Sequence, residues 1–80
     1  MDKSKILSEI QEILRDVLDE PTVILAETTT PTEVDGWDSM AHLQLIVAIE
    51  KHFGINFNSN EILSWRSVGE MLNSIVSKVG

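Results

Sequence analysis

The chain has 80 residues, a formal net charge of −7 and no cysteine. We expect a single domain over residues 1–80, because half of this length could not bury a sufficient core. The acidic balance argues against nucleic acid and anionic lipid as ligands, and the lack of cysteine excludes disulfides, thiolate nucleophiles and cysteine-based zinc sites.

The negative charge lies in the first half of the chain. Residues 1–38 hold ten Asp or Glu against three Lys or Arg, whereas residues 39–80 hold three of each. Basic proteins are therefore the partners that the charge favours. The sequence contains neither a signal-peptide pattern nor an apolar run of about 20 residues, the length of a membrane span. We expect a cytoplasmic monomer without stable membrane insertion.

The first predicted element is an amphipathic helix from about Ser4 to Leu18. Asp2 or Ser4 can cap its start by accepting a hydrogen bond from a free backbone N–H. Pro21 ends it, because proline lacks a donor and restricts the preceding residue. The apolar residues recur at helical spacing and form one face: Ile6, Leu7, Ile10, Ile13, Leu14, Val17 and Leu18.

In residues 19–37 the apolar residues do not recur at helical or strand spacing. This segment contains Pro31 and the Asp35-Gly36 turn pair. No alternating strands flank this pair, so we predict a long loop and no sheet. Connections of this length in small domains are usually functional or anchored by their own apolar residues. The residues expected to anchor this one are Ile24, Leu25, Val34 and Trp37.

A second helix is predicted from Ser39 to about Phe53, with Asp38 as its N-cap and Gly54 as its left-handed stop. It carries two apolar stripes side by side. The first consists of Leu45, Ile46, Ile49 and Phe53, and the second of Met40, Leu43 and Val47. A band this wide indicates a helix that is central in its bundle or presents part of its surface to another molecule.

Two further helices are predicted from capping signals. Asn58 with Glu61 starts a short helix over about Ser59–Ser64, and Ser67 with Glu70 starts the last one, over about Val68–Lys78. The sequence therefore predicts an all-α fold. The expected architecture is a four-helix bundle with three longer helices, a short third helix and a long loop between the first two.

Ser39 lies at the start of the second predicted helix, in the triplet Asp38-Ser39-Met40. The first turn of a helix presents unsatisfied backbone N–H groups and the positive end of the helix dipole, which favour an anion. A phosphate esterified to the Ser39 hydroxyl would therefore be stabilised there. The Asp-Ser pair alone favours simple helix initiation, for which serine is common.

The wider order of features resembles the acyl carrier protein family: a long loop, D-S-M, an apolar helix containing AIEKHFG, a short capped helix and a final S-x-x-E helix. The resemblance spans roughly Ile6 to Val79. It implies that Ser39, next to the motif residue and helix cap Asp38, carries 4′-phosphopantetheine from coenzyme A. The thiol of this group would hold an acyl or aminoacyl group as a thioester, which makes the chain a non-catalytic carrier.

The resemblance also implies partners: a phosphopantetheinyl transferase, a ligase that loads the acyl or aminoacyl group, and downstream acyl-transfer enzymes. Family members often place acids after the serine and along this helix, but Ala41, Gln44 and Lys51 stand at those positions here. We therefore expect a dedicated set of partners. They are expected to dock on Asp35, Asp38, Met40, Leu43 and Glu50.

Ile62 and Trp65 occupy positions where fatty-acid carriers generally have smaller aliphatic residues around the cargo. The cargo pocket expected from the resemblance is lined by Ile46, Ile49, Ile62 and Trp65. The larger side chains predict a narrow cavity and a short or exposed cargo. Plain core packing, with Trp65 filling space, is the simpler interpretation of the same residues.

Other functions are less well supported. Ser39 and His42 share a helix face near Asp38, but the sequence shows neither the oxyanion hole nor the G-x-S-x-G turn of a hydrolase. His42 and His52 lack metal-ligand spacing, and residues 35–38 lack the pattern of a calcium loop, so no metal is expected. A helical interaction module that carries nothing stays open as an alternative.

The identity of the cargo stays open as well. Peptidyl carriers commonly show G-G-[HD]-S where this chain has G-W-D-S, whereas D-alanyl carriers share the D-S-M triplet. A D-alanyl or other aminoacyl load is therefore the alternative to an acyl load. The chain starts at Met1 and ends soon after the last helix, so we expect a free-standing carrier, although a domain excised from a larger synthase could have the same bounds.

Overall fold

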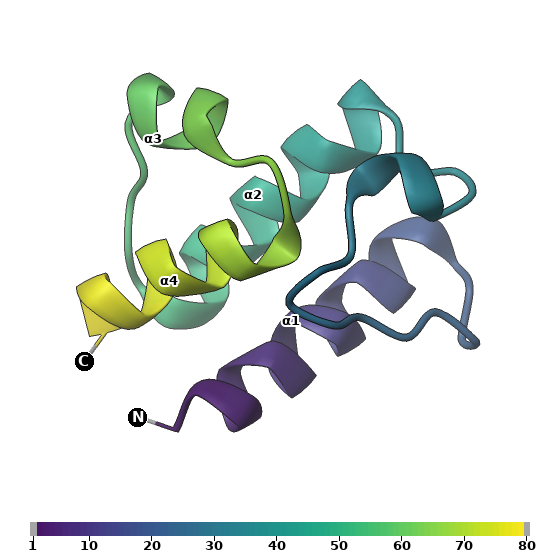
Figure 1. Cartoon of the computed structure of the whole chain (residues 1–80), viewed down its shortest axis with the longest axis horizontal. Coiled ribbons are helices and arrows are strands. Elements are labelled where there is room, and N and C mark those ends of the chain that lie inside the picture. Colours follow the sequence, from purple (N-terminus) through teal and green to yellow (C-terminus); the bar gives the residue numbers. More distant parts are fainter. Residues whose placement is uncertain (1, 80) are drawn as a thin grey trace.

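The computed structural model describes residues 2–79, which form four α-helices and a short 3₁₀ turn at Pro31–Glu33. The helices are α1 (Lys3–Leu18), α2 (Ser39–Phe53), α3 (Ser59–Ser64) and α4 (Val68–Val79). Figure 1 shows α3 as a short segment between α2 and α4, and both chain ends on the same side of the view. The predicted all-α fold, with its long connection between α1 and α2, is confirmed.

Three of the helices begin with the predicted caps. The Asp2 carboxylate accepts a hydrogen bond from the backbone N–H of Ser4 at 3.1 Å, and the Asp38 carboxylate accepts one from Ala41 at 2.9 Å. At α3 the Asn58 side chain and Glu61 bond to each other's backbone N–H groups, at 2.8 and 3.3 Å. These caps satisfy first-turn donors, which is why the helix starts could be predicted from local sequence.

The start of α4 differs from the predicted Ser67–Glu70 capping box. The backbone N–H groups of Val68 and Gly69 donate to the carbonyl oxygens of Thr29 and Glu27, each at 2.8 Å. The Glu70 carboxylate accepts from the backbone N–H of Arg66 instead of Ser67. Donors of this first turn are thus satisfied by the distant connection between α1 and α2.

The connection between α1 and α2 is held by buried side chains and by α1. Val23, Leu25 and Trp37 are buried, and Val34 is half-buried against the core. The expectation that Ile24 helps to anchor the connection is wrong, because its side chain is 77% exposed. Its neighbours Val23 and Leu25 are buried, so the side chain of Ile24 faces away from the core while theirs face into it.

Side chains of α1 also hold this connection through its backbone. The Arg15 Nε–H donates to the carbonyl oxygen of Val23 at 2.8 Å, and the Gln11 side-chain oxygen accepts from the N–H of Leu25 at 2.8 Å. Together with the two bonds to α4, these contacts fix the segment that leads to the start of α2. These contacts therefore hold the chain in place on its way to Ser39.

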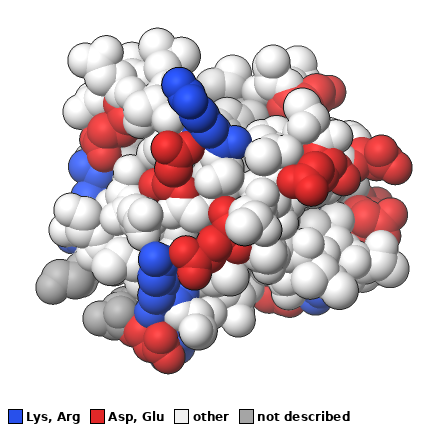
Figure 2. Space-filling view, in the orientation of Figure 1, with Lys and Arg blue, Asp and Glu red and all other residues white. Residues whose placement is uncertain are grey.

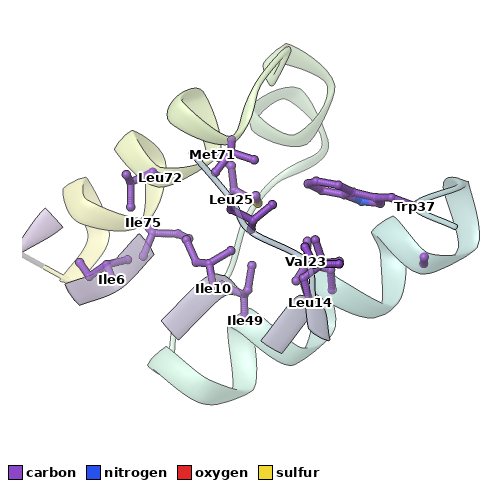
Figure 3. Packing of buried hydrophobic residues seen from close by; sticks show 13 residues of the cluster. Ile6, Ile10, Leu14, Val23, Leu25, Trp37, Ile49, Met71, Leu72 and Ile75 are labelled. Atoms are coloured by element: carbon purple, nitrogen blue, oxygen red, sulfur yellow. The ribbon is translucent and has the colours of Figure 1, made fainter. Parts of the chain in front are cut away.

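The hydrophobic core is built between α1, α2 and α4. Figure 3 shows Leu25 close to Met71 and the ring of Trp37 pointing into the cluster. The completely buried side chains come from three helices: Ile6, Ile10 and Leu14 of α1, Leu45 and Ile49 of α2, and Leu72 and Ile75 of α4. Of the two apolar stripes on α2, the one with Leu45, Ile46 and Ile49 therefore faces the core.

Two further sequence predictions concern the extent of the chain and membranes. None of the helices within residues 2–79 combines the length and the apolar character that a membrane span requires. The expected domain bounds at Met1 and Gly80 lie outside the described residues.

Candidate functional site

Ser39 is the first residue of α2, and its side chain is exposed. The chain reaches it through a tight turn in which Gly36 has a φ of +84° and its carbonyl oxygen accepts from the N–H of Asp38 at 3.0 Å. Asp38 then turns the chain into the helix, because its carboxylate bonds Ala41 and its carbonyl oxygen bonds the N–H of His42. The hydroxyl of Ser39 is thus presented at the surface by a rigid helix start.

The start of α2 suits a phosphate ester. Asp38 satisfies the N–H groups of Ala41 and His42, whereas no hydrogen bond is recorded within residues 2–79 for those of Ser39 and Met40. These two donors and the positive end of the 15-residue helix lie next to the Ser39 hydroxyl. A negatively charged phosphate at this oxygen would therefore be stabilised by groups already in place.

Two tryptophans and a histidine surround one side of Ser39. The indole Nε1–H of Trp37 donates to Nδ1 of His42 at 3.2 Å, and the His42 ring meets Trp65 edge-on with centroids 6.5 Å apart. A groove of about 320 Å³ runs along these rings. It is lined by Pro31, Trp37, Asp38, Ser39, His42 and Trp65. Sequence reasoning did not predict this setting of His42, because its contact with Trp65 is not local.

Burial lowers the pKa of His42 from its ordinary value of 6.5. The neutral ring fits the hydrogen bond from Trp37, since Nδ1 can accept only while it carries no proton. This bond also bears on the hydrolase alternative. Nδ1 is directed to Trp37, and no hydrogen bond between Ser39 and His42 is recorded within the described residues.

The other sequence-predicted residues lie in three different settings. Met40 and Leu43 are 69% and 61% exposed and share a stripe with Val47, and Asp35 is exposed near the turn. Glu50 is half-buried, and its carboxylate accepts a hydrogen bond from the N–H of Phe57 at 2.9 Å. Glu50 therefore supports the connection between α2 and α3, in addition to any role in docking.

The four residues of the expected cargo pocket are not equivalent. Ile46 and Ile49 are buried, whereas Ile62 and Trp65 are half-buried. Trp65 donates its Nε1–H to the Ser74 hydroxyl of α4 at 2.9 Å and packs edge-on against Phe57. Behind the groove it lines a cavity of only about 10 Å³, room for about one water molecule.

No group of three or more His, Cys, Asp or Glu side chains in residues 2–79 is arranged to hold a metal ion. The groups that the described site offers are a hydroxyl at a helix start and the aromatic rings beside it.

Comparison with known proteins decides which family has this arrangement. The family described as phosphopantetheine attachment site matches residues 8–75, which include all of α2 and α3 and most of α1 and α4. The chain belongs to the acyl carrier protein family.

Two acyl carrier proteins from other organisms align with this chain over nearly its full length. An acyl carrier protein of Thermosynechococcus vestitus is 29% identical over 99% of this chain and 98% of its own length. One of Acidothermus cellulolyticus is 26% identical over 96% of this chain and 92% of its own. Membership of the acyl carrier protein family gives the cofactor as 4′-phosphopantetheine and the function as an acyl carrier.

A solved structure of the acyl carrier protein family has the same fold. The solution structure of a holo acyl carrier protein from Geobacter metallireducens superposes with a TM-score of 0.86 at 32% identity. The match covers 91% of this chain and 84% of that one. The four-helix arrangement is therefore shared with a family member that was studied in its holo form.

Proposed function

We propose that Ser39 is the attachment residue of this acyl carrier protein. A 4′-phosphopantetheine arm esterified to its hydroxyl would hold the acyl group as a thioester. The observation that supports this assignment is the exposed hydroxyl at the start of α2, within the Asp38-Ser39-Met40 triplet and the region that matches the phosphopantetheine attachment family. The free N–H groups of the first helical turn favour the charge of the phosphate diester.

The chain would serve as the substrate of a phosphopantetheinyl transferase. In that reaction a bond forms between Ser39 Oγ and the phosphorus next to the pantetheine of coenzyme A. The bond from this phosphorus to the bridging oxygen of the diphosphate breaks, adenosine 3′,5′-bisphosphate leaves, and the hydroxyl proton is released. The arm supplies a terminal thiol on a long flexible chain. The protein supplies a rigid helix start that holds the ester, and a surface that partners recognise.

The partners proposed are this transferase, an acyl-loading ligase and the enzymes that use the acyl group. Met40, Leu43 and Val47 give α2 an exposed apolar stripe next to Ser39, which suits a partner surface of apolar character. Asp35 adds negative charge at the same end of the helix. We place these reactions in the cytoplasm, because the thiol of the arm needs an environment that keeps thiols reduced.

The test is the intact mass of the protein after incubation with coenzyme A and a phosphopantetheinyl transferase. The wild type is expected to gain the mass of one phosphopantetheinyl group, and Ser39→Ala to gain nothing. Ser59→Ala is the matched control, since Ser59 is also an exposed serine at the first position of a helix. Loss of the mass gain in Ser59→Ala but not in Ser39→Ala would contradict the assignment.

The same pair of variants separates the carrier from a helical interaction module that carries nothing. A carrier loses every acyl-transfer reaction when Ser39 is replaced by alanine. A module that acts only through the apolar surface of α2 still binds its partner and keeps its function after this substitution. Acyl transfer measured with a purified ligase and both variants distinguishes the two functions.

A further inference from the structure

A second pocket, of about 350 Å³, lies on the connection between α1 and α2. None of its lining residues belongs to the groove beside Ser39. Its apolar lining consists of Leu18, Val23, Ile24 and Val34. The Ile24 side chain is 77% exposed and adds apolar surface to the concave site. The volume lies within the range of pockets that bind small molecules, and apolar surface at such a site favours a guest with an apolar part.

The walls of this pocket are held by the fold. Val23 is buried, and the turn at Gly36 approaches the end of α1 so closely that a Cβ atom there would lie 3.9 Å from Leu18 Cδ2. Asp35, which precedes this turn, lines the pocket. Four residues of chain keep the Cα of Asp35 within about 14 Å of that of Ser39. A partner that works at Ser39 is therefore close enough to contact the pocket as well.

The polar lining of the pocket is acidic. It includes the carboxylates of Glu20, Glu33 and Asp35 and contains no Lys, Arg or His. None of the ion pairs recorded within residues 2–79 includes one of these three acids. The pocket therefore combines an apolar surface with negative charge that no cation of the described chain balances.

Hydrogen bonds orient two of these carboxylates. Glu20 Oε1 accepts from the Thr22 hydroxyl at 2.7 Å and from the Thr22 N–H at 3.2 Å, which lowers the pKa of Glu20 below its ordinary value of 4.5. Glu33 Oε2 accepts from the N–H and the hydroxyl of Thr30, at 2.6 and 3.1 Å. No hydrogen bond is recorded in the described chain for the second oxygen of either carboxylate. Each can therefore accept one from a guest.

Another pocket of similar volume shows that acidic lining alone does not give this combination. It measures about 360 Å³ and lies on α1, where Glu9, Glu12 and Asp16 line it together with Lys5 and His52. Its acids share the pocket with two basic side chains, and Glu9 is paired with His52 at 3.1 Å. The pocket on the connection between α1 and α2 is thus the better site for an added cation.

We propose that this pocket receives an arginine side chain of a basic partner enzyme, as a docking contact in addition to the exposed stripe on α2. The methylene stem of arginine suits the apolar lining, and its planar guanidinium can donate to two carboxylate oxygens at once. This inference rests on the proposed carrier function, because the partner is an enzyme that acts on the group held at Ser39.

The test is a titration of the unmodified protein with N-acetyl-arginine amide, followed by NMR of the backbone amides. Saturable shifts are expected at Thr22, Ile24 and Asp35, with a dissociation constant on the order of 10 mM, because exposed charge pairs contribute little. N-acetyl-citrulline amide has the same shape without the charge and is expected to cause no saturable shift. Equal shifts with the two probes would overturn the proposal.

Two matched variants separate the pocket from net charge. Asp35→Asn is expected to weaken binding of the arginine probe about two- to fivefold, the range of a single exposed charge pair. Asp16→Asn removes the same charge from an exposed residue that lines the other pocket, and it is expected to leave binding unchanged. Equal weakening in both variants would show that only the net charge attracts the probe, which would overturn the proposal.

The failure of this inference and the failure of the proposed function give different results. If Ser39 is not the attachment residue, Ser39→Ala gains the same mass as the wild type while the arginine probe still binds. If Ser39 is the attachment residue but the pocket does not receive arginine, the mass gain depends on Ser39 and the arginine and citrulline probes behave alike.

Discussion

Gly69 allows the connection between α1 and α2 to approach α4 closely. A Cβ atom at this position would lie 2.8 Å from the carbonyl oxygen of Glu27, and the same oxygen accepts the hydrogen bond from the Gly69 N–H. A side chain would have to push the connection away and weaken that bond. Backbone atoms cannot move aside as a flexible side chain can, so a tight fit of this kind requires glycine.

Gly69→Ala is therefore expected to destabilise the fold, although alanine is the better helix former. The expected loss is about 1–3 kcal/mol, as for other overpacked buried sites. Urea unfolding monitored by circular dichroism measures it. Ser77→Ala, at an exposed position of the same helix, is expected to change stability by less than about 0.5 kcal/mol. Equal stability of the two variants would show that the close approach to Glu27 is not needed.

His42 makes stability depend on pH. Its pKa is lowered by burial, so the unfolded chain binds a proton more readily than the folded one. The stability associated with the neutral ring is complete above the ordinary pKa of 6.5 and is lost as the pH falls through the lower folded pKa. The effect is expected to be small, because the ring is only partly buried and solvent screens its charge.

The measurement is the difference in unfolding free energy between pH 7.5 and pH 5.5, for the wild type and for His42→Phe. The carboxylates titrate in both proteins and largely cancel in the comparison. The wild type should lose more stability than the variant. A larger loss in the variant would contradict the assignment of a neutral, partly buried ring.

At the scale of the elements, the helices were predicted correctly because their signals are local. Periodic apolar residues and the caps at Asp38 and Asn58 need only neighbours within a few positions. The errors concern contacts between distant segments. Ile24 was assigned to the core because sequence does not give the direction of a side chain in an extended loop. The cap of α4 was missed because its acceptors belong to Glu27 and Thr29.

For the candidate site, the position of Ser39 at the start of α2 and the cap at Asp38 follow from local helix signals. The role proposed for Ser39 comes from the resemblance to a family. The pairs Trp37–His42 and Trp65–Ser74 require knowledge of how α2, α3 and α4 pack. No sequence pattern marked the groove that they form.

The docking surface proposed on α2 and the turn before it has apolar and acidic parts, which can be tested separately from the structural role of the helix. Leu43 and Asp35 are exposed, whereas the Glu50 carboxylate bonds the backbone of Phe57. Leu43→Ala and Asp35→Lys are expected to lower the rate of transfer to Ser39 with little change in stability. Glu50→Lys is expected to lower both the transfer rate and the stability. The free energy of unfolding should fall by about 1 kcal/mol for the missing hydrogen bond.

The transfer rate with the transferase and the urea unfolding curve are measured for each of the three variants. Together they distinguish a loss of docking from a loss of stability. Gln44→Ala is the control for Leu43, because Gln44 is an exposed residue beside Leu43 on the same helix. Unchanged transfer in both Leu43→Ala and Asp35→Lys would remove these residues from the docking surface.

At the scale of the whole molecule, the acidic charge is unevenly distributed. Figure 2 shows many Asp and Glu side chains on the side that Figure 1 shows to be formed by the connection between α1 and α2. This connection leads directly to Ser39. A net charge of −7 with this distribution would attract a basic partner to the end of the molecule that carries the proposed attachment residue.

Salt is therefore expected to slow the transfer reaction. Raising the ionic strength from about 0.01 M to about 0.5 M shortens the range of the field several-fold, and kcat/KM of a basic transferase should fall by about tenfold or more. The rate with saturating carrier should change little. A kcat/KM that is independent of salt would contradict steering by the acidic side.

The most direct test of the account is to locate the modification on the chain. Protein treated with coenzyme A and a phosphopantetheinyl transferase is digested and its peptides are fragmented in the mass spectrometer. The account predicts that the whole mass gain is on Ser39. A gain located on any other residue, or no gain under conditions in which a related acyl carrier protein is modified, would contradict it.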